Sequence, residues 1–304
     1  MKHPIKLSRT DLILLTLLTL FWGINWPVMK FAVLEYPPLA FRALSMCIGI
    51  AGLWAWMKIR KESFFVPITE RKRLVHLAIG NMVIWHLFAI YAIKYLSSGR
   101  AAIIGYTMPV WALLASVLFF KDRLTWRGGV GVLLAMLATL LLTIDELGSL
   151  LGKPLGLVLM TIAAIGWGIG TAMMNHMKVS ISNASLTFWM MVLTCTVLAL
   201  GSALLEMHDW RMPHFGEWMT IFYNAFVVFC FCHIAWFRLA RKLPPVASSL
   251  SIMLIPPLGV IAGAWSLGET VSAWDVSALL LILLSMAAVL VPGRKTKPAT
   301  AEPQ

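Results

Sequence analysis

The chain has 304 residues, of which 60% are hydrophobic and only 12% are charged, and its mean hydropathy is +0.84. Soluble domains carry about 25% charged residues, so this composition excludes a soluble enzyme, a disordered chain and a secreted disulfide scaffold. The formal net charge of +12 does not indicate a nucleic-acid partner, because the basic residues stand in short loops between apolar segments and form no single patch or stripe.

Apolar segments of about 20 residues, each long enough to cross the roughly 30 Å hydrocarbon core of a bilayer, recur along the whole chain. We therefore expect an all-α integral membrane protein with ten transmembrane helices, at residues 11–34, 38–57, 74–96, 99–120, 126–144, 154–177, 184–205, 217–239, 245–267 and 273–291. The first segment follows a basic leader, but it is too long for a signal peptide and lacks a small-x-small cleavage site. It is expected to stay in the protein as an uncleaved helix.

The loops predict the orientation of these helices. If the N-terminus is cytoplasmic, 19 Lys and Arg residues lie on the cytoplasmic side and about five on the opposite side. Because cytoplasmic loops are enriched in Lys and Arg, we expect both termini in the cytoplasm of a bacterial-type inner (plasma) membrane protein. Residues 1–10 then form a short cytoplasmic N-terminus, and residues 293–304 form a disordered cytoplasmic tail.

The two halves of the chain resemble each other. A shift of 145 residues brings the segment FWGIN onto GWGIG and places Trp22 on Trp167. A shift of 147 residues aligns three further pairs, His86 with His233, Pro109 with Pro256, and Asp122 with Glu269. Since five spans is an odd number, the second copy enters the membrane from the opposite side. We expect two inverted five-helix repeats, residues 11–147 and 152–292, around a central cavity. This cavity is expected to open alternately to the two sides of the membrane.

Other classes of membrane protein fit less well. The sequence contains no signature of a channel filter, no HExxH motif, no clustered carboxylates and no glycine-rich phosphate loop, so we expect neither an enzyme nor a cofactor or metal site. The four cysteines lie inside apolar segments and support neither a zinc site nor a disulfide framework. A non-transporting membrane interaction protein is the alternative of another class, and such a scaffold would be expected to show an extramembrane surface that these short loops do not supply.

These features together resemble the drug/metabolite transporter superfamily, and within it the EamA type. The resemblance implies a basket-like bundle in which spans one to four and six to nine surround a central cavity while spans five and ten brace it. The segments FWGINWPVMKFAV, IWHLF and GYTMPVW are similar to bacterial amino acid exporters, including exporters of aromatic amino acids. Asp122 departs from the family pattern, which usually has glutamate there.

Several buried aromatic and polar residues are candidates for contact with a transported solute. One face of the first span carries a stripe with the spacing i, i+3, i+4 and i+7, formed by Trp22, Asn25, Trp26 and Met29. Such a stripe fits cavity lining and helix packing almost equally well. The predicted substrate-binding residues are Trp22, Asn25, Asn81, Trp85, His86, Tyr106, Trp167 and His233.

For several of these positions two interpretations stay open. The histidine pair is either hydrogen-bonded within the core or in contact with substrate or proton. Tyr106 either lines the cavity or bonds backbone groups that a kink at Pro109 would free. The glycines around Trp167 permit close packing or bending, and packing is favoured. Arg42 either anchors the second span near its outer end, where it can pair with Glu35, or contacts a substrate carboxylate. The predicted hinges are Pro109, Pro256 and Pro257.

The spans contain no deep carboxylate and too few cations for a phosphorylated solute. An aromatic cavity with sparse polar groups fits a solute with an apolar side chain and a small polar head. We expect an exporter of aromatic and other neutral amino acids, or related metabolites, that runs down existing gradients. A proton-coupled efflux transporter for cationic drugs is the alternative. The expected partners are this small molecule and the lipid bilayer, while net direction, any coupling ion and oligomeric state are not predicted.

Overall fold

The structure is a computed structural model that describes residues 8–148, 154–177, 179–240 and 252–290, apart from the side chains of 236–238 and 240. The predicted tail, residues 293–304, and most of the predicted N-terminal segment lie outside the described residues. The described elements are all helical: α1 (Arg9–Glu35), α2 (Pro38–Ile59), α3 (Ile68–Ala78), η1 (Ile79–Val83), α4 (Ile84–Tyr95), α5 (Ser98–Gly105), α6 (Met108–Phe120), α7 (Trp126–Gly148), α8 (Pro154–His176), α9 (Asn183–Leu205), η2 (Met207–Asp209), α10 (Phe215–Phe222), η3 (Tyr223–Cys232), α11 (His233–Ala240), α13 (Ile255–Leu267) and α14 (Ala273–Leu290).

The predicted ten-span architecture is confirmed. In the part of the chain that the structure describes, nine helical segments are long and apolar enough to cross a membrane, and the shorter apolar helix α13 belongs to the ninth predicted span. The third span begins at Ile68, six residues before the predicted start, because the polar first turns of α3 extend the helix beyond its apolar part. Apolar runs therefore locate the spans but not their polar ends.

The third and eighth spans are not uniform α-helices. The third span contains the π-helical segment η1, and the eighth contains the longer π-helical segment η3. With the repeat spacing of 147 residues, η1 corresponds to residues 226–230, which lie within η3. Nothing in the apolar pattern predicted these wide turns, which recur in both halves at equivalent depth.

The fourth and ninth spans are broken at equivalent positions. Helix α5 ends at Gly105, and α6 begins at Met108 with Pro109 in its first turn. Helix α13 begins at Ile255, and Pro256 and Pro257 are the next two residues of its first turn. Proline suits the first turn of a helix because its missing N–H has no partner to lose there. Pro109 and Pro256 thus begin new half-helices instead of kinking a continuous helix, and their role as hinges stays a prediction.

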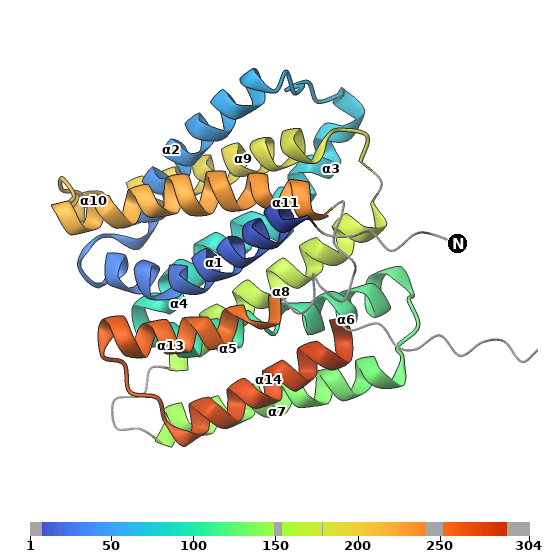
Figure 1. The fold of residues 1–304 in the computed structure, drawn as a ribbon, viewed down its shortest axis with the longest axis vertical. Coiled ribbons are helices and arrows are strands. Elements are labelled where there is room, and N and C mark those ends of the chain that lie inside the picture. The colour runs from blue at the N-terminus through green and yellow to red at the C-terminus, as the bar shows by residue number, and fades with distance from the viewer. Residues whose placement is uncertain (1–7, 149–153, 178, 241–251, 291–304) are drawn as a thin grey trace, which may run out of the picture.

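Helices from the two halves pack in matching pairs (Figure 1). Helix α7 packs along α14 at one end of the molecule, and α2 packs along α9 at the other. Between them, α1 packs against α13, and its repeat counterpart α8 packs against α6. If the two halves are exchanged, the pairs α7–α14 and α2–α9 each map onto themselves, and the pair α1–α13 maps onto α8–α6. An inverted repeat with an approximate two-fold axis requires this pattern.

An ionic cluster joins the α7–α14 pair to the rest of the bundle. Arg100 on α5 pairs with Asp145 and Glu146 of α7, and its Nε donates to Asp275 of α14 over 2.8 Å. Glu269, just before α14, accepts hydrogen bonds from the backbone N–H groups of Ser98 (2.7 Å) and Gly99 (3.3 Å), at the start of α5. These contacts give spans five and ten the bracing position that the family resemblance implies.

Candidate functional site

Four aromatic side chains from both halves meet inside the bundle, and we call them the aromatic cluster: Trp26, Trp85, Tyr106 and Trp167. The ring of Trp26 on α1 lies 6.4 Å from that of Trp85 on α4 and 6.2 Å from that of Tyr106, measured between centroids. Trp85 in turn lies 5.3 Å from Trp167 on α8. The Trp85–Trp167 contact therefore joins the first half of the chain to the second.

Glycines bring the helices of this cluster together. A Cβ at Gly170 would lie 2.6 Å from the Cα of Asn81, and a Cβ at Gly166 would lie 2.7 Å from the Cβ of Ile84. A Cβ at Gly105 would lie 2.9 Å from the ring of Trp26. The glycines of α8 thus allow close approach of η1 and α4, which confirms that they serve packing.

A second group, the Phe229 cluster, consists of Arg42, His86, Asn224, Phe229 and His233. The ring of Phe229 lies 5.6 Å from that of His86 and 6.2 Å from that of His233. The guanidinium carbon of Arg42 lies 5.7 Å from the same ring, and its Nη1 donates to Asn224 Oδ1 over 3.1 Å. The two histidines that the repeat relates therefore lie on a shared phenylalanine ring.

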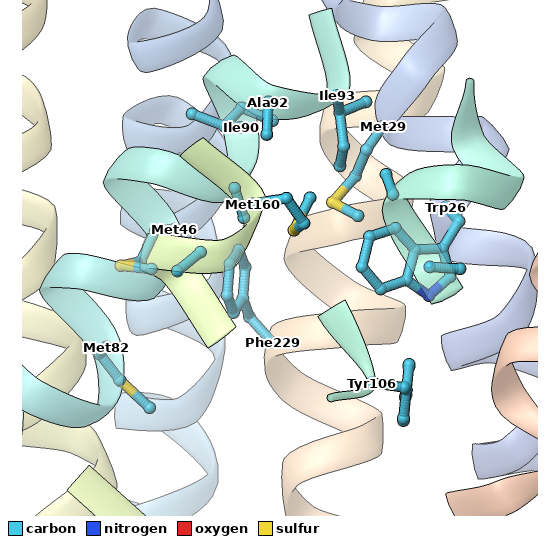
Figure 2. Packing of buried hydrophobic residues seen from close by; sticks show 14 of the residues in the cluster. Trp26, Met29, Met46, Met82, Ile90, Ala92, Ile93, Tyr106, Met160 and Phe229 are labelled. Carbon is cyan, nitrogen blue, oxygen red and sulfur yellow. The ribbon is translucent and has the colours of Figure 1, made fainter. Parts of the chain in front are cut away.

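Both clusters contribute side chains to one buried core (Figure 2). Trp26 and Met29 of α1, Tyr106 and Phe229 all lie in a single contiguous set of buried hydrophobic side chains. Met29 accepts a hydrogen bond from the Arg42 guanidinium through its sulfur. The stripe on α1 thus carries Trp26 to the aromatic cluster and Met29 to the Phe229 cluster.

The other predicted site residues lie around this core. Asn81 in η1 donates to Thr171 Oγ1 over 3.4 Å and faces α8. Asn25 is buried, and its Oδ1 has no hydrogen-bond partner among the described residues. Trp22 is half-buried and packs between the main core and a small cluster that includes Leu18 and Ala235, so the structure does not place it in the aromatic cluster.

The side chain of Arg42 is buried within the bundle. It is only 3% exposed, and its hydrogen-bond partners are Asn224 and Met29, not Glu35. Its Nε, like Nδ1 of His86, is buried without a hydrogen-bond partner in the described part of the chain. Nδ1 of His233, in contrast, donates to the carbonyl oxygen of Val228 over 3.0 Å.

Sequence reasoning missed Asn224 and Phe229. The signal available for Asn224 was a lone amide in the apolar eighth span, where a polar side chain is costly and therefore informative. Phe229 gave no signal, because nothing distinguishes it from the other phenylalanines of that span. Its position between two histidines becomes visible only when the third and eighth spans are packed.

The predicted site residues line neither of the two cavities that we describe. One cavity of about 520 Å³ lies between α2 and α9, and its walls include Tyr36, Cys47, Cys195 and Arg211. A much smaller one lies beside Arg100 and Glu269. The aromatic cluster is instead closed by contacts between its own rings. Among the described residues, no group of three or more His, Cys, Asp or Glu is arranged to hold a metal ion.

Comparison with known proteins gives consistent matches along the chain. The model of the EamA-like transporter family matches twice, at residues 10–144 and 154–291. The uncharacterized transporter YoaV of Bacillus subtilis is 22% identical over 87% of this chain and 91% of its own. The uncharacterized inner membrane transporter YedA of Escherichia coli K12 is 24% identical over 93% of this chain and 90% of its own.

One similar protein carries a more specific name. The probable amino-acid metabolite efflux pump of Salmonella typhimurium is 24% identical over 92% of this chain and 94% of its own. A solved crystal structure matches 95% of this chain and 100% of its own with a TM-score of 0.64 and 18% identity. At that identity the structural likeness shows the fold alone.

Proposed function

This chain belongs to the EamA-like transporter family, and from that premise we propose that it exports neutral amino acids, aromatic ones included, or related metabolites. Transport occurs by alternating access between residues 11–147 and 152–292, with both termini in the cytoplasm as the loop charges indicate. The solute runs down its own gradient. The name of the Salmonella relative supports the substrate class.

The observation that carries this proposal is the aromatic cluster built from both halves of the chain. Trp85 comes from the first half and Trp167 from the second, and their rings are in contact. Indole and phenol rings offer apolar surface to a side chain and cation–π contact to an ammonium group. When one half moves against the other, the rings that the two halves contribute can separate toward one side of the membrane while they stay in contact toward the other. Such a movement suits alternating access.

The placement of the carboxylates supports a facilitator. The buried acidic residues of the described chain all lie in the first or last turn of a helix or at its cap: Asp11, Glu70, Glu146, Glu206, Glu217 and Asp275. Glu206, for example, accepts hydrogen bonds from the backbone N–H groups of Leu39 (3.0 Å) and Ala40 (2.9 Å) at the start of α2. A proton-coupled pump commonly uses a carboxylate at depth, in the middle of a span.

Release from proteoliposomes tests substrate class and energetics together. The liposomes are preloaded with labelled Phe, Trp, Met and Thr and with a cationic dye, and release is followed with and without an imposed proton gradient. We expect the amino acids to leave in both conditions at rates above protein-free liposomes. Release of the dye alone, and only with the gradient, would replace this proposal by drug antiport, with His86 or His233 as the coupling group.

A further inference from the structure

Arg42 is a buried cation without a buried anion. Both of its hydrogen-bond partners, Asn224 Oδ1 and the Met29 sulfur, are neutral, and its Nε has no partner among the residues that the structure describes. Within the described ranges no carboxylate forms an ion pair with it, whereas Arg100 pairs with three carboxylates and Arg211 pairs with Glu217. Arg100, near the start of α5, and Arg211, in the loop between η2 and α10, are thus neutralised, whereas Arg42 inside the bundle is not.

A buried charge is normally paired, because removing an ion from water is costly unless an opposite charge replaces the solvent. Polar and ionisable side chains inside a membrane bundle therefore mark binding sites for solutes. The planar guanidinium matches a carboxylate with two parallel N–H donors. A carboxylate can accept one hydrogen bond from the Nε–H of a guanidinium and a second from a neighbouring Nη–H. The Nε–H of Arg42, which has no partner in the described chain, is one of these donors.

The surroundings of Arg42 supply the remaining parts of a site for a zwitterion. Asn25 lies one helical turn before Met29 on α1, and its unpartnered Oδ1 is an acceptor suited to an ammonium group. Trp26 lies next to Asn25 and belongs to the aromatic cluster. His86 presents a second unpartnered polar atom beside the same Phe229 ring. Besides Nε of Arg42, two buried polar atoms thus have no hydrogen-bond partner in the described chain. Asn25 Oδ1 lies on the helix face that carries Met29, a contact of Arg42, and His86 lies on the Phe229 ring that Arg42 also contacts.

We propose that Arg42 binds the carboxylate of the transported solute, and that the protein therefore selects free carboxylic acids, above all zwitterionic amino acids, over their amides and over cationic drugs. This inference rests on the proposed transport of amino acids and names the group that recognises them. Asn224 holds the guanidinium in place through its Oδ1 and acts as a positioning residue.

Equilibrium binding to the purified full-length protein in detergent tests this directly. Isothermal titration compares L-phenylalanine with L-phenylalaninamide, which lacks the carboxylate. We expect the wild type to bind the acid about 30-fold or more tightly than the amide, as for loss of one partner from a desolvated charge pair. Arg42→Gln should reduce this ratio to about threefold or less, while Arg60→Gln, at the exposed far end of α2, should preserve it.

A second variant guards against misfolding of Arg42→Gln. Asn224→Asp keeps the shape of the side chain that contacts Arg42 but supplies a resident carboxylate, which neutralises the guanidinium from within the fold. We expect this variant to elute as a folded protein in size exclusion and to lose the preference for the acid. Retention of the wild-type ratio in folded Asn224→Asp and Arg42→Gln would overturn the inference, as would equal binding of acid and amide by the wild type. Binding that follows our expectation without any transport would instead refute the proposed function alone.

Discussion

Trp85 occupies the centre of the aromatic cluster, because its ring contacts both Trp26 and Trp167. Each aromatic pair contributes about 0.5–1.5 kcal/mol beyond the area that it buries. Loss of two such pairs and of the proposed contact with the solute predicts about tenfold slower transport in Trp85→Ala. The rate is measured as release of labelled L-phenylalanine from proteoliposomes that contain equal amounts of inserted protein.

Trp265→Ala is the matched control, since Trp265 is 90% exposed on the outer face of α13. This variant removes an indole of the same size from the lipid-facing surface and should release substrate at the wild-type rate. Equal rates for Trp85→Ala and Trp265→Ala would remove the aromatic cluster from the transport pathway.

At the residue scale the sequence predicted the stripe on α1 but not its partners. The spacing of Trp22, Asn25, Trp26 and Met29 places them on one face, yet helical period alone cannot say which neighbouring helix each one meets. Trp26 entered the aromatic cluster and Trp22 did not. Arg42 stands near the start of α2, and its long side chain reaches the core, which no local pattern could predict.

At the element scale, the contact between α8 and η1 depends on the absence of a side chain at Gly170. A methyl group there would lie 2.6 Å from the Cα of Asn81, and the backbone of η1 would have to shift. Overpacking of this kind costs about 1–3 kcal/mol, so we expect Gly170→Ala to lower the midpoint of thermal unfolding in detergent.

The control for this prediction is Gly129→Ala on α7, where a Cβ would meet nothing within 4 Å. Alanine favours the helical state by about 1 kcal/mol over glycine, so the control should be unchanged or more stable. If Gly170→Ala were as stable as Gly129→Ala, the close packing of α8 on η1 would not contribute to stability.

The half-helices show why the sequence could locate spans but not their internal breaks. Pro109 and Pro256 correctly marked irregular positions in the fourth and ninth spans. A proline pattern alone does not distinguish a kink from the start of a new helix, because both accommodate the missing N–H. The π-helical turns of η1 and η3 were invisible for a related reason, since they depend on tertiary packing and have no fixed residue signature.

At the scale of the whole molecule, the repeat of about 147 residues predicted the arrangement of the bundle. The equivalent pairs α1–α13 and α8–α6 follow from it, as does the proximity of His86 and His233. The chemistry of the site is not symmetric, however. Asn224 corresponds to Leu77 at this spacing, so only one half supplies the amide that holds Arg42. Repeat analysis therefore predicts the fold better than it predicts the polar groups of the site.

Counterflow tests most directly whether the two halves carry a neutral amino acid across the membrane. Proteoliposomes are loaded with unlabelled L-phenylalanine and diluted into a trace of the labelled compound, with an ionophore present to abolish any proton gradient. We predict that the wild type and Trp265→Ala accumulate label transiently above equilibrium, while Trp85→Ala does so far more slowly. Absence of this overshoot in the wild type, with the protein inserted and folded, would contradict facilitated exchange of amino acids by alternating access.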